Sequence, residues 1–174
     1  AEKTLLNYAQ KEGAEVAILL HSDGQYSPEK IPDLIKPFDN NQADIVQGSR
    51  MMGDGALKGG MPLYKFVSNK ALTFIENLSF GMKMAEFHSG YMLYARKALL
   101  EIPFNKLSDS FDFDLEMLVM AKIKGLRIVE VPIVFTERVQ GHSKMSGNII
   151  SEALIMVWRL WFQNGMRRRP REPR

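Results

Sequence analysis

A short apolar run that breaks off at a carboxylate constrains the fold of this chain more than any other feature. Residues 16–20 read VAILL, an unbroken apolar run of strand length. Such a run is typical of a strand that is covered on both faces, as in a sheet with helices on either side. The polar stretch 21–25 follows, and Ser27 and Pro28 are then typical of the first positions of a helix. This region therefore predicts a strand, a polar loop and a helix in immediate succession.

The same alternation of strand and helix patterns continues along the chain. Three more strand-like runs cover residues 44–49, 91–95 and 127–135. Helical patterns are found in residues 2–12, in residues 113–124, and after Pro62, where Leu63, Val67, Leu72, Ile75 and Leu78 keep helical spacing as far as Gly81. Because helices are interleaved with strands, the sequence predicts an α/β fold with a largely parallel sheet.

Composition permits a single domain and limits the kinds of site it can hold. The chain has 174 residues, of which 45% are hydrophobic and 25% charged, as in ordinary soluble proteins. It has no cysteine, which excludes disulfides and thiolate metal sites. The three histidines, His21, His88 and His142, lack the spacing of a zinc site.

The loop after the first predicted strand carries the groups of a possible ligand site. Ligands of open α/β sheets bind beyond the carboxyl ends of the strands, and Asp23 and Gln25 lie at that edge. Their oxygens suit a hard cation such as Mg²⁺ or Mn²⁺, and the following helix start favours an anion. The residues are compatible with a metal–diphosphate site, but taken alone they favour an aspartate turn before an ordinary Ser-Pro helix start.

Six motifs resemble, in their order along the chain, those of the inverting glycosyltransferases of family 2. They are HSDGQYSPE (21–29), DIVQGSR (44–50), GALKGGMPLYKFVSNKALTFIENL (55–78), EFHSGYMLYARKAL (86–99), GLRIVEVPI (125–133) and RVQGHSK (138–144). The set is most similar to the polyprenyl-phosphate branch, which includes the dolichol-phosphate mannose synthases. This resemblance implies a GT-A fold, which is a Rossmann-like, mostly parallel sheet flanked by helices. It also implies a metal-dependent, inverting transfer of a sugar from a nucleotide-diphosphate donor to a polyprenyl phosphate or a related acceptor.

The resemblance further implies roles for residues on the donor side. Asp23 and Gln25 match the second aspartate and the glutamine of the family's Asp-x-Asp-x-Gln motif, so they would hold Mg²⁺ or Mn²⁺, and Asp23 would be essential for catalysis. His21 stands in place of the first aspartate, and imidazole favours Mn²⁺ over Mg²⁺. Arg50 corresponds to a family arginine near the phosphates, where its planar guanidinium would neutralise the leaving diphosphate.

Two further motifs are similar to phosphate-binding and acceptor-binding segments of the family. In the loop 138–144, the residues expected to clamp the phosphates of donor and lipid are Arg138, Ser143 and Lys144. The motif 86–91 resembles the acceptor side, where a small Ser-Gly turn would leave room for substrate. Its candidate acceptor-side residues are Glu86, His88 and Ser89.

An acidic cluster at a predicted helix start offers candidates for a general base. It contains Asp112, Asp114 and Glu116, and the helix dipole favours acids there in any case. Asp112 and Glu116 are the residues predicted to be catalytic. A sugar hydroxyl as acceptor would require such a base, whereas a lipid phosphate is already ionised near neutral pH and would not.

The C-terminal segment predicts contact with an anionic surface. Residues 147–166 read as an amphipathic helix with two tryptophans, and residues 167–174 form a basic tail. From Arg159 onward there are six arginines and one glutamate, which leaves 17 basic and 19 acidic residues before it. This pattern suits a membrane interface, although a helix packed on the chain's own core or a dimer contact is an alternative. Nucleic-acid binding is disfavoured because no aromatic stacking platform accompanies the arginines.

These patterns predict a partial GT-A domain over residues 1–146, followed by the helix and the tail. Family members begin with a strand and a loop that cradles the nucleotide base, and no matching segment precedes the helix at 2–12. We therefore expect the chain to be the C-terminal part of a cytoplasmic transferase, peripheral at the inner face of the membrane. The alternative is a catalytically incomplete, membrane-associated binding module that keeps the glycosyltransferase scaffold.

Overall fold

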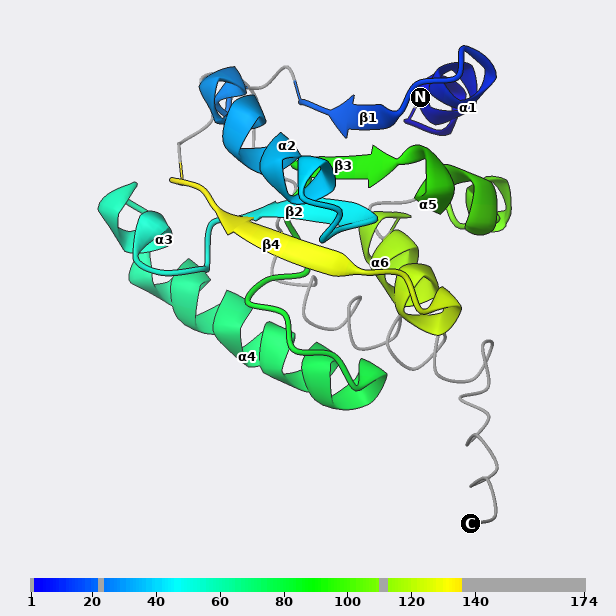
Figure 1. The fold of residues 1–174 in the computed structure, drawn as a ribbon. Helices are drawn as coiled ribbons and strands as arrows, with labels where there is room; N and C mark the ends of the chain where they lie inside the picture. Colours follow the sequence, from blue (N-terminus) through cyan, green and yellow to red (C-terminus); the bar gives the residue numbers. More distant parts are fainter. Residues whose placement is uncertain (1, 22–23, 110–112, 136–174) are drawn as a thin grey trace.

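The computed structural model describes residues 2–21, 24–109 and 113–135 (Figure 1). Their elements are, in chain order, α1 (Glu2–Lys11), β1 (Val16–Leu19), the 3₁₀ turn η1 (Pro28–Lys30), α2 (Ile31–Asp39), β2 (Ile45–Ser49), α3 (Gly55–Lys58), α4 (Leu63–Phe80), β3 (Met92–Ala95), α5 (Arg96–Glu101), the 3₁₀ turn η2 (Phe104–Lys106), α6 (Phe113–Lys124) and β4 (Ile128–Pro132). Each of the four predicted strands forms inside its predicted run. The predicted helix at 147–166 and the basic tail at 167–174 lie outside the described residues.

The strands form one mixed sheet in the order β1-β3-β2-β4. β3 pairs antiparallel with both β1 and β2, whereas β2 and β4 are parallel. Three strands therefore share one direction and β3 runs against them, as the arrows in Figure 1 show. The prediction of an α/β fold is confirmed. β3 is reversed because the chain returns from α4 along the carboxyl edge of the sheet, where the N–H of Gly48 donates to the carbonyl of Tyr91 over 2.9 Å.

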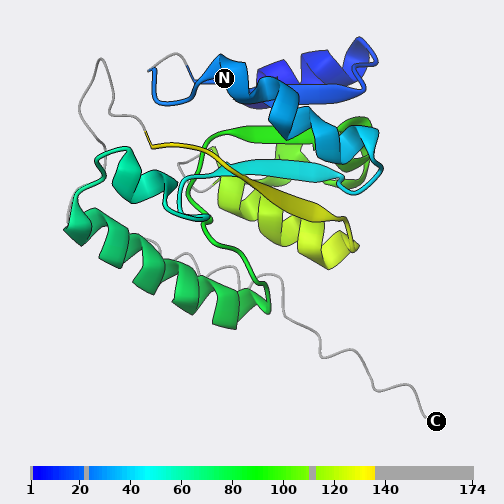
Figure 2. The same cartoon turned by 60° about the vertical axis from the view of Figure 1, so that its left-hand side comes forward.

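Helices cover both faces of the sheet, which gives the domain two apolar cores (Figures 1 and 2). On one face Leu34 of α2 packs with Val46 and Leu93. On the other face the side chains of α1, α5 and α6 pack with Ile45 and Tyr94. Successive residues of β2 and β3 thus point to opposite cores, as the two-residue period of a strand requires.

The helix after the first polar loop begins differently from the sequence pattern. Pro28 is in the first turn as predicted, but that turn is 3₁₀ and α2 starts only at Ile31. Ser27 occupies the N-cap position without a side-chain bond to the backbone, because its hydroxyl donates to the carboxylate of Glu29 instead. The helical segment therefore begins where the sequence predicts, but the expected capping hydrogen bond of Ser27 is not formed.

An ion pair between the buried Asp44 and the partly exposed Arg127 fastens the opposite, amino edge of the sheet. The carboxylate of Asp44, which is 3% exposed, accepts hydrogen bonds from the Arg127 backbone N–H over 2.8 Å and from its Nη2 over 2.9 Å. These bonds lower the pKa of Asp44 to about 2. The ion pair joins the residue before β2 to the residue before β4, so its role is to hold the sheet rather than to bind ligand.

The long helix α4 has an unexpected orientation. It follows Pro62 and ends at Gly81 as the sequence predicts. Of the apolar residues that keep helical spacing, however, Leu72 is buried, whereas Leu63, Val67 and Leu78 are more than half exposed. The buried side of α4 is instead mainly polar, because it meets the Glu86 carboxylate and the His88 imidazole. Among the described residues no helix is long and apolar enough to cross a membrane.

Candidate active site

Three loops meet at the carboxyl edge of the sheet, where β1, β2 and β4 end and β3 begins. They comprise residues 20–21 and 24–27 after β1, residues 50–54 after β2, and residues 86–91 before β3. Ligands of α/β sheets bind at this edge. The described ends of the predicted motifs, residues 24–27, Arg50 and residues 86–91, therefore lie at the same edge.

Two tyrosines fix the loop after β1 to the start of β3. The hydroxyl oxygen of Tyr26 accepts the Gly90 N–H over 2.9 Å, and the Tyr91 hydroxyl donates to the Ser27 carbonyl over 3.1 Å. The two rings also pack against each other, with centroids 5.2 Å apart. Burial raises the pKa of Tyr26, so it stays a neutral phenol at physiological pH. The segment that carries Gln25 is thus held close to the motif at 86–91.

Because Gly90 has no side chain, the ring of His21 fits beside it. A Cβ atom at this position would lie 2.7 Å from Nε2 of His21, so any other residue here would displace the His21 ring. The His21 ring also meets Tyr26 edge-on, with centroids 5.9 Å apart. The Ser-Gly turn was predicted to leave space for substrate, but the space beside Gly90 holds the His21 ring. Ser89 is fully buried, and its hydroxyl donates to the Gly48 carbonyl.

Arg50 is held at the end of β2 by a buried carboxylate. Glu86 is completely buried and forms an ion pair with the Arg50 Nη2 atom. The same carboxylate accepts hydrogen bonds from the Arg50 Nε over 3.3 Å and from its backbone N–H over 2.9 Å. Nη2 also donates to the His88 carbonyl over 2.7 Å. No described residue accepts a hydrogen bond from Nη1, and the side chain is 13% exposed.

Side chains from two other elements support Glu86. Asn69 of α4 donates to the Glu86 carboxylate over 3.3 Å. Glu130 of β4 accepts the backbone N–H groups of Ala85 over 2.6 Å and of Glu86 over 3.1 Å. Burial raises the pKa of Glu130. Elements β2, α4 and β4 together therefore fix the position of the Arg50 guanidinium.

A second buried carboxylate holds His88. Glu76 of α4 is fully buried, and its Oε1 lies 2.7 Å from the Nε2 atom of His88. The His88 side chain is 13% exposed. The sequence placed Glu86, His88 and Ser89 on the acceptor side. In the structure Glu86 and Ser89 are enclosed by protein, so either residue would act on an acceptor only through its neighbours.

The acidic residues at the start of α6 bind different partners. Glu116 accepts the backbone N–H of Ser108 over 2.7 Å and so fastens the preceding loop. Asp114 instead accepts a hydrogen bond from the Tyr94 hydroxyl over 3.3 Å. Burial, with a contribution from Glu2, raises the pKa of Asp114 from 3.8 to about 7. Asp112 lies outside the described residues.

Several predicted site residues cannot be placed in this geometry. Asp23, Arg138, Ser143 and Lys144 lie outside the described residues. Gln25 is partly buried at the carboxyl edge. Within the described part of the chain, no group of three His, Cys, Asp or Glu side chains could hold a metal ion. The Mg²⁺ or Mn²⁺ site at Asp23 and Gln25 therefore stays a prediction.

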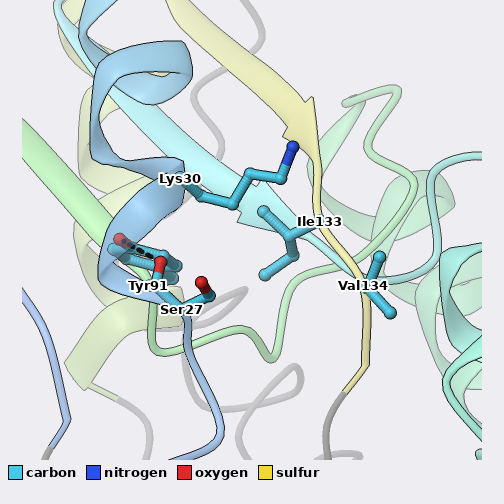
Figure 3. Close-up of a pocket in the computed structure, with 5 residues that line it drawn as sticks. All are labelled: Ser27, Lys30, Tyr91, Ile133 and Val134. Carbon is cyan, nitrogen blue, oxygen red and sulfur yellow. Dashed lines mark hydrogen bonds between the residues drawn. The ribbon is translucent and has the colours of Figure 1, made fainter.

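A small pocket opens on the same edge between η1 and the residues after β4 (Figure 3). It has a volume of about 160 Å³ and is lined by Ser27, Lys30, Tyr91, Ile133 and Val134. Sites for drug-sized ligands usually measure about 300–1,000 Å³. This pocket alone is therefore too small to enclose a nucleotide sugar.

Comparison with known proteins identifies the family. The model of "Glycosyl transferase family 2" matches residues 3–102. This chain belongs to glycosyl transferase family 2. The resemblance of the six motifs and the α/β fold agree with this assignment.

Curated relatives in the family resemble the chain over most of its length. An undecaprenyl-phosphate mannosyltransferase of Micrococcus luteus is 33% identical over 86% of this chain and 60% of its own length. A polyprenol monophosphomannose synthase of Mycolicibacterium smegmatis is 31% identical over 87% of this chain and 57% of its own length. A UDP-N-acetylglucosamine–dolichyl-phosphate N-acetylglucosaminyltransferase of Methanococcus voltae is 33% identical over 88% of this chain and 62% of its own length. The chain thus spans about three-fifths of the length of these relatives.

The glycines of the motif at 55–60 allow a close backbone approach in this family 2 chain. A Cβ atom on Gly59 would lie 2.0 Å from the Phe135 carbonyl oxygen, and one on Gly55 would lie 2.3 Å from that of Ile133. The Gly55 carbonyl also accepts the Phe135 N–H over 3.1 Å. α3 therefore packs directly on the backbone that leads from β4 towards residues 138–144.

Replacing Gly59 by alanine is expected to lower the free energy of unfolding by about 1–3 kcal/mol, because backbone atoms must move apart. Gly53 offers a control: it has no atom within 4 Å of an added Cβ, although its φ of 73° strains any side chain. Urea denaturation of both variants would measure the difference. A Gly59→Ala cost no larger than that of Gly53→Ala would argue against the close packing.

Sequence patterns missed two residues that shape this site. Glu76 is the one acid in α4, and Glu130 is the one acid in β4. For Glu130 the available signal is a lone carboxylate in an otherwise apolar strand, because burial of such a group requires a partner. Glu76 lies in a helix with many polar residues and gives no such signal. The partners come from residues 85–88, which no local pattern connects to either element.

Proposed function

We propose that this chain forms the catalytic part of an enzyme that transfers a sugar from a nucleotide-diphosphate donor to a polyprenyl phosphate. The observation that carries the proposal is Arg50, a guanidinium held in one orientation at the carboxyl edge of the sheet. Family membership and the polyprenyl- or dolichyl-phosphate transferases among the relatives support it. A fixed guanidinium that retains a donor group suits a site where negative charge develops on a leaving diphosphate.

The proposal assigns a role to each group on the donor side. Arg50 would contact the diphosphate through Nη1, while Glu86 and the His88 carbonyl hold the other nitrogens in place. Asp23 and Gln25 would hold Mg²⁺ or Mn²⁺, which would neutralise charge on the departing nucleoside diphosphate. Arg138, Ser143 and Lys144 would clamp phosphates of donor and acceptor.

The acceptor determines whether a base is required. An ionised oxygen of a polyprenyl phosphate can attack the anomeric carbon from the side opposite the leaving group, which gives inversion without removal of a proton. A glycan hydroxyl would need a base. Asp112 and Glu116 were predicted for that role, but Glu116 binds the Ser108 N–H. The raised pKa of Asp114 would suit it better to proton transfer near neutral pH.

We also propose that the protein acts at the inner face of the membrane as a peripheral protein, with residues 147–174 contributing to attachment. The lipid acceptors named for the relatives support this location. The competing proposal is a binding module that keeps the scaffold without turnover. No observation in the described residues favours that module over a transferase.

A transfer assay tests the proposed function. Labelled GDP-mannose or UDP-N-acetylglucosamine would be incubated with the protein, Mn²⁺ and vesicles that contain undecaprenyl phosphate. We expect label to enter the lipid extract, and Arg50→Lys to slow the transfer roughly 100-fold because a point charge cannot replace the fixed guanidinium. Arg96→Lys, on the exposed start of α5, is the matched control and should leave the rate unchanged. Nucleotide binding without any transfer would favour the binding module.

A further inference from the structure

Two basic side chains at the carboxyl edge, Arg50 and His88, are held in the same manner. Each side chain is 13% exposed, and each has a fully buried carboxylate as its partner, Glu86 for Arg50 and Glu76 for His88. Glu86 lies in the same loop as His88, whereas Glu76 is the one acid of α4. A distant helix therefore contributes a buried charge to this edge of the sheet.

Attachment of α4 to the domain does not explain why this charge is buried. Among the described residues none donates a hydrogen bond to the second oxygen of Glu76, Oε2. Burying a carboxylate is costly, and a neutral side chain can attach a helix without this cost. Asn77, the next residue of α4, does so through two hydrogen bonds of 2.8 Å with the backbone of Met84. What distinguishes Glu76 from Asn77 is its partner, His88.

His88 connects Glu76 to the proposed phosphate site. Its Nε2 atom lies 2.7 Å from the Glu76 Oε1 atom, and its backbone carbonyl accepts a hydrogen bond of 2.7 Å from the Arg50 Nη2 atom. Because the ring is held by α4, the backbone of residue 88 is held with it, and so is the direction of this carbonyl. The guanidinium is planar, so fixing Nη2 and Nε also fixes the direction of Nη1.

We propose that Glu76 is a positioning residue for the diphosphate: it holds His88, whose carbonyl orients the Arg50 guanidinium. The segment that leads from α4 back to β3 runs between the helix and the sheet, which places residues 86–88 between the two (Figures 1 and 2). Asn69, about two turns before Glu76 on the same side of α4, reaches the guanidinium by a second path through Glu86. The inference rests on the proposed function only for its ligand, a nucleoside diphosphate.

The Arg50 guanidinium gives a readout that needs no ligand. In ¹⁵N-labelled protein, a guanidinium that cannot rotate about its Nε–Cζ bond shows separate Nη signals, and Arg50→Lys would assign those of Arg50. Glu76→Leu should average these signals, because the His88 ring loses its partner. Glu76→Gln, which keeps an oxygen for the ring, should preserve them. Glu76→Asp moves the carboxylate back from the ring and should also average them, which covers the case that Glu76→Leu does not fold.

Asn77→Leu is the matched structural control. It removes both hydrogen bonds between α4 and the backbone of Met84 without removing a contact of His88. We expect this variant to lower the melting temperature and to leave the separate Nη signals of Arg50 as they are in wild type. A role of Glu76 in stability alone would not produce this difference between the two variants.

Calorimetric titration of GDP and UDP with Mn²⁺ gives a second readout. The affinity for the preferred nucleotide should fall about fivefold or more in Glu76→Leu, as is typical for a coupled residue that does not touch the ligand. Glu76→Gln and Asn77→Leu should bind the nucleotide as wild type does.

Two results would overturn the inference. The first is that the separate Nη signals of Arg50 persist in both Glu76→Leu and Glu76→Asp. The second is that Asn77→Leu averages them to the same degree, which would show that any loosening of α4 releases Arg50. A wild type that binds neither nucleotide, with Arg50 signals that respond to Glu76 as expected, would support the positioning role and contradict the proposed function.

Discussion

Replacing Glu86 by alanine is expected to lower the free energy of unfolding by about 3–5 kcal/mol. Glu86 is completely buried, and its carboxylate is the ion-pair partner of Arg50 and accepts a bond from Asn69. Removing one member of a buried ion pair leaves the other charge without compensation, which is the costly case. Chemical denaturation would measure the loss. Glu101→Ala, at an exposed position of α5, should change the stability by less than about 0.5 kcal/mol.

A double variant separates the structural effect of Glu86 from its effect on Arg50. Replacing both partners, as in Arg50→Met with Glu86→Leu, should recover much of the stability, because neither charge is then left buried alone. Donor binding should still be lost, because the guanidinium is absent. If Glu86→Ala were as mild as Glu101→Ala, the ion pair would not be the support that the geometry indicates.

Asp114→Asn is expected to stabilise the protein above pH 7 and to remove a pH dependence. Burial raises the pKa of Asp114 to about 7 in the folded state, from an ordinary value of 3.8. Between these values the folded protein binds a proton that the unfolded chain has released, so stability falls as pH rises through this window. At pH 8 the ionised carboxylate costs about 2–4 kcal/mol, and the neutral amide avoids this cost.

Thermal or urea denaturation between pH 4 and pH 8 would measure this effect. Wild-type protein should lose stability across the window relative to Asp114→Asn, with the largest difference at pH 8. Asp109→Asn is a suitable control, because that exposed carboxylate has its pKa lowered by Lys3. Parallel pH profiles for wild type and Asp114→Asn would show that Asp114 ionises normally in the folded protein.

The sequence predicted the elements of the fold more completely than their arrangement. The strand-like runs at 16–20, 44–49, 91–95 and 127–135 all contain strands. The clearest of them, VAILL at 16–20, is continuous and apolar, as expected of a strand between two layers of helices. The reversed direction of β3 could not be predicted from such runs. It depends on where the chain returns from α4. That place is marked by the hydrogen bond between Gly48 and Tyr91, two residues that are 43 positions apart in the sequence.

The candidate site was predicted in its location and only partly in its contacts. Arg50 lies at the carboxyl edge as expected, but a motif cannot show that Glu86 and the His88 carbonyl occupy most of its donors. The orientation of α4 was missed for a similar reason. Helical spacing identifies an apolar side but cannot tell which side faces the protein, and here Glu76 and Asn69 find partners inside.

Calorimetric titration of GDP and of UDP, with and without Mn²⁺, tests the central claim most directly. That claim is that Arg50, held by Glu86, binds the diphosphate of a nucleotide-sugar donor. Wild-type protein should bind one of the two nucleotides in a metal-dependent manner, and Arg50→Met with Glu86→Leu should not bind it. Equal affinity in the two proteins, or no binding by wild type in the presence of Mn²⁺, would contradict the account.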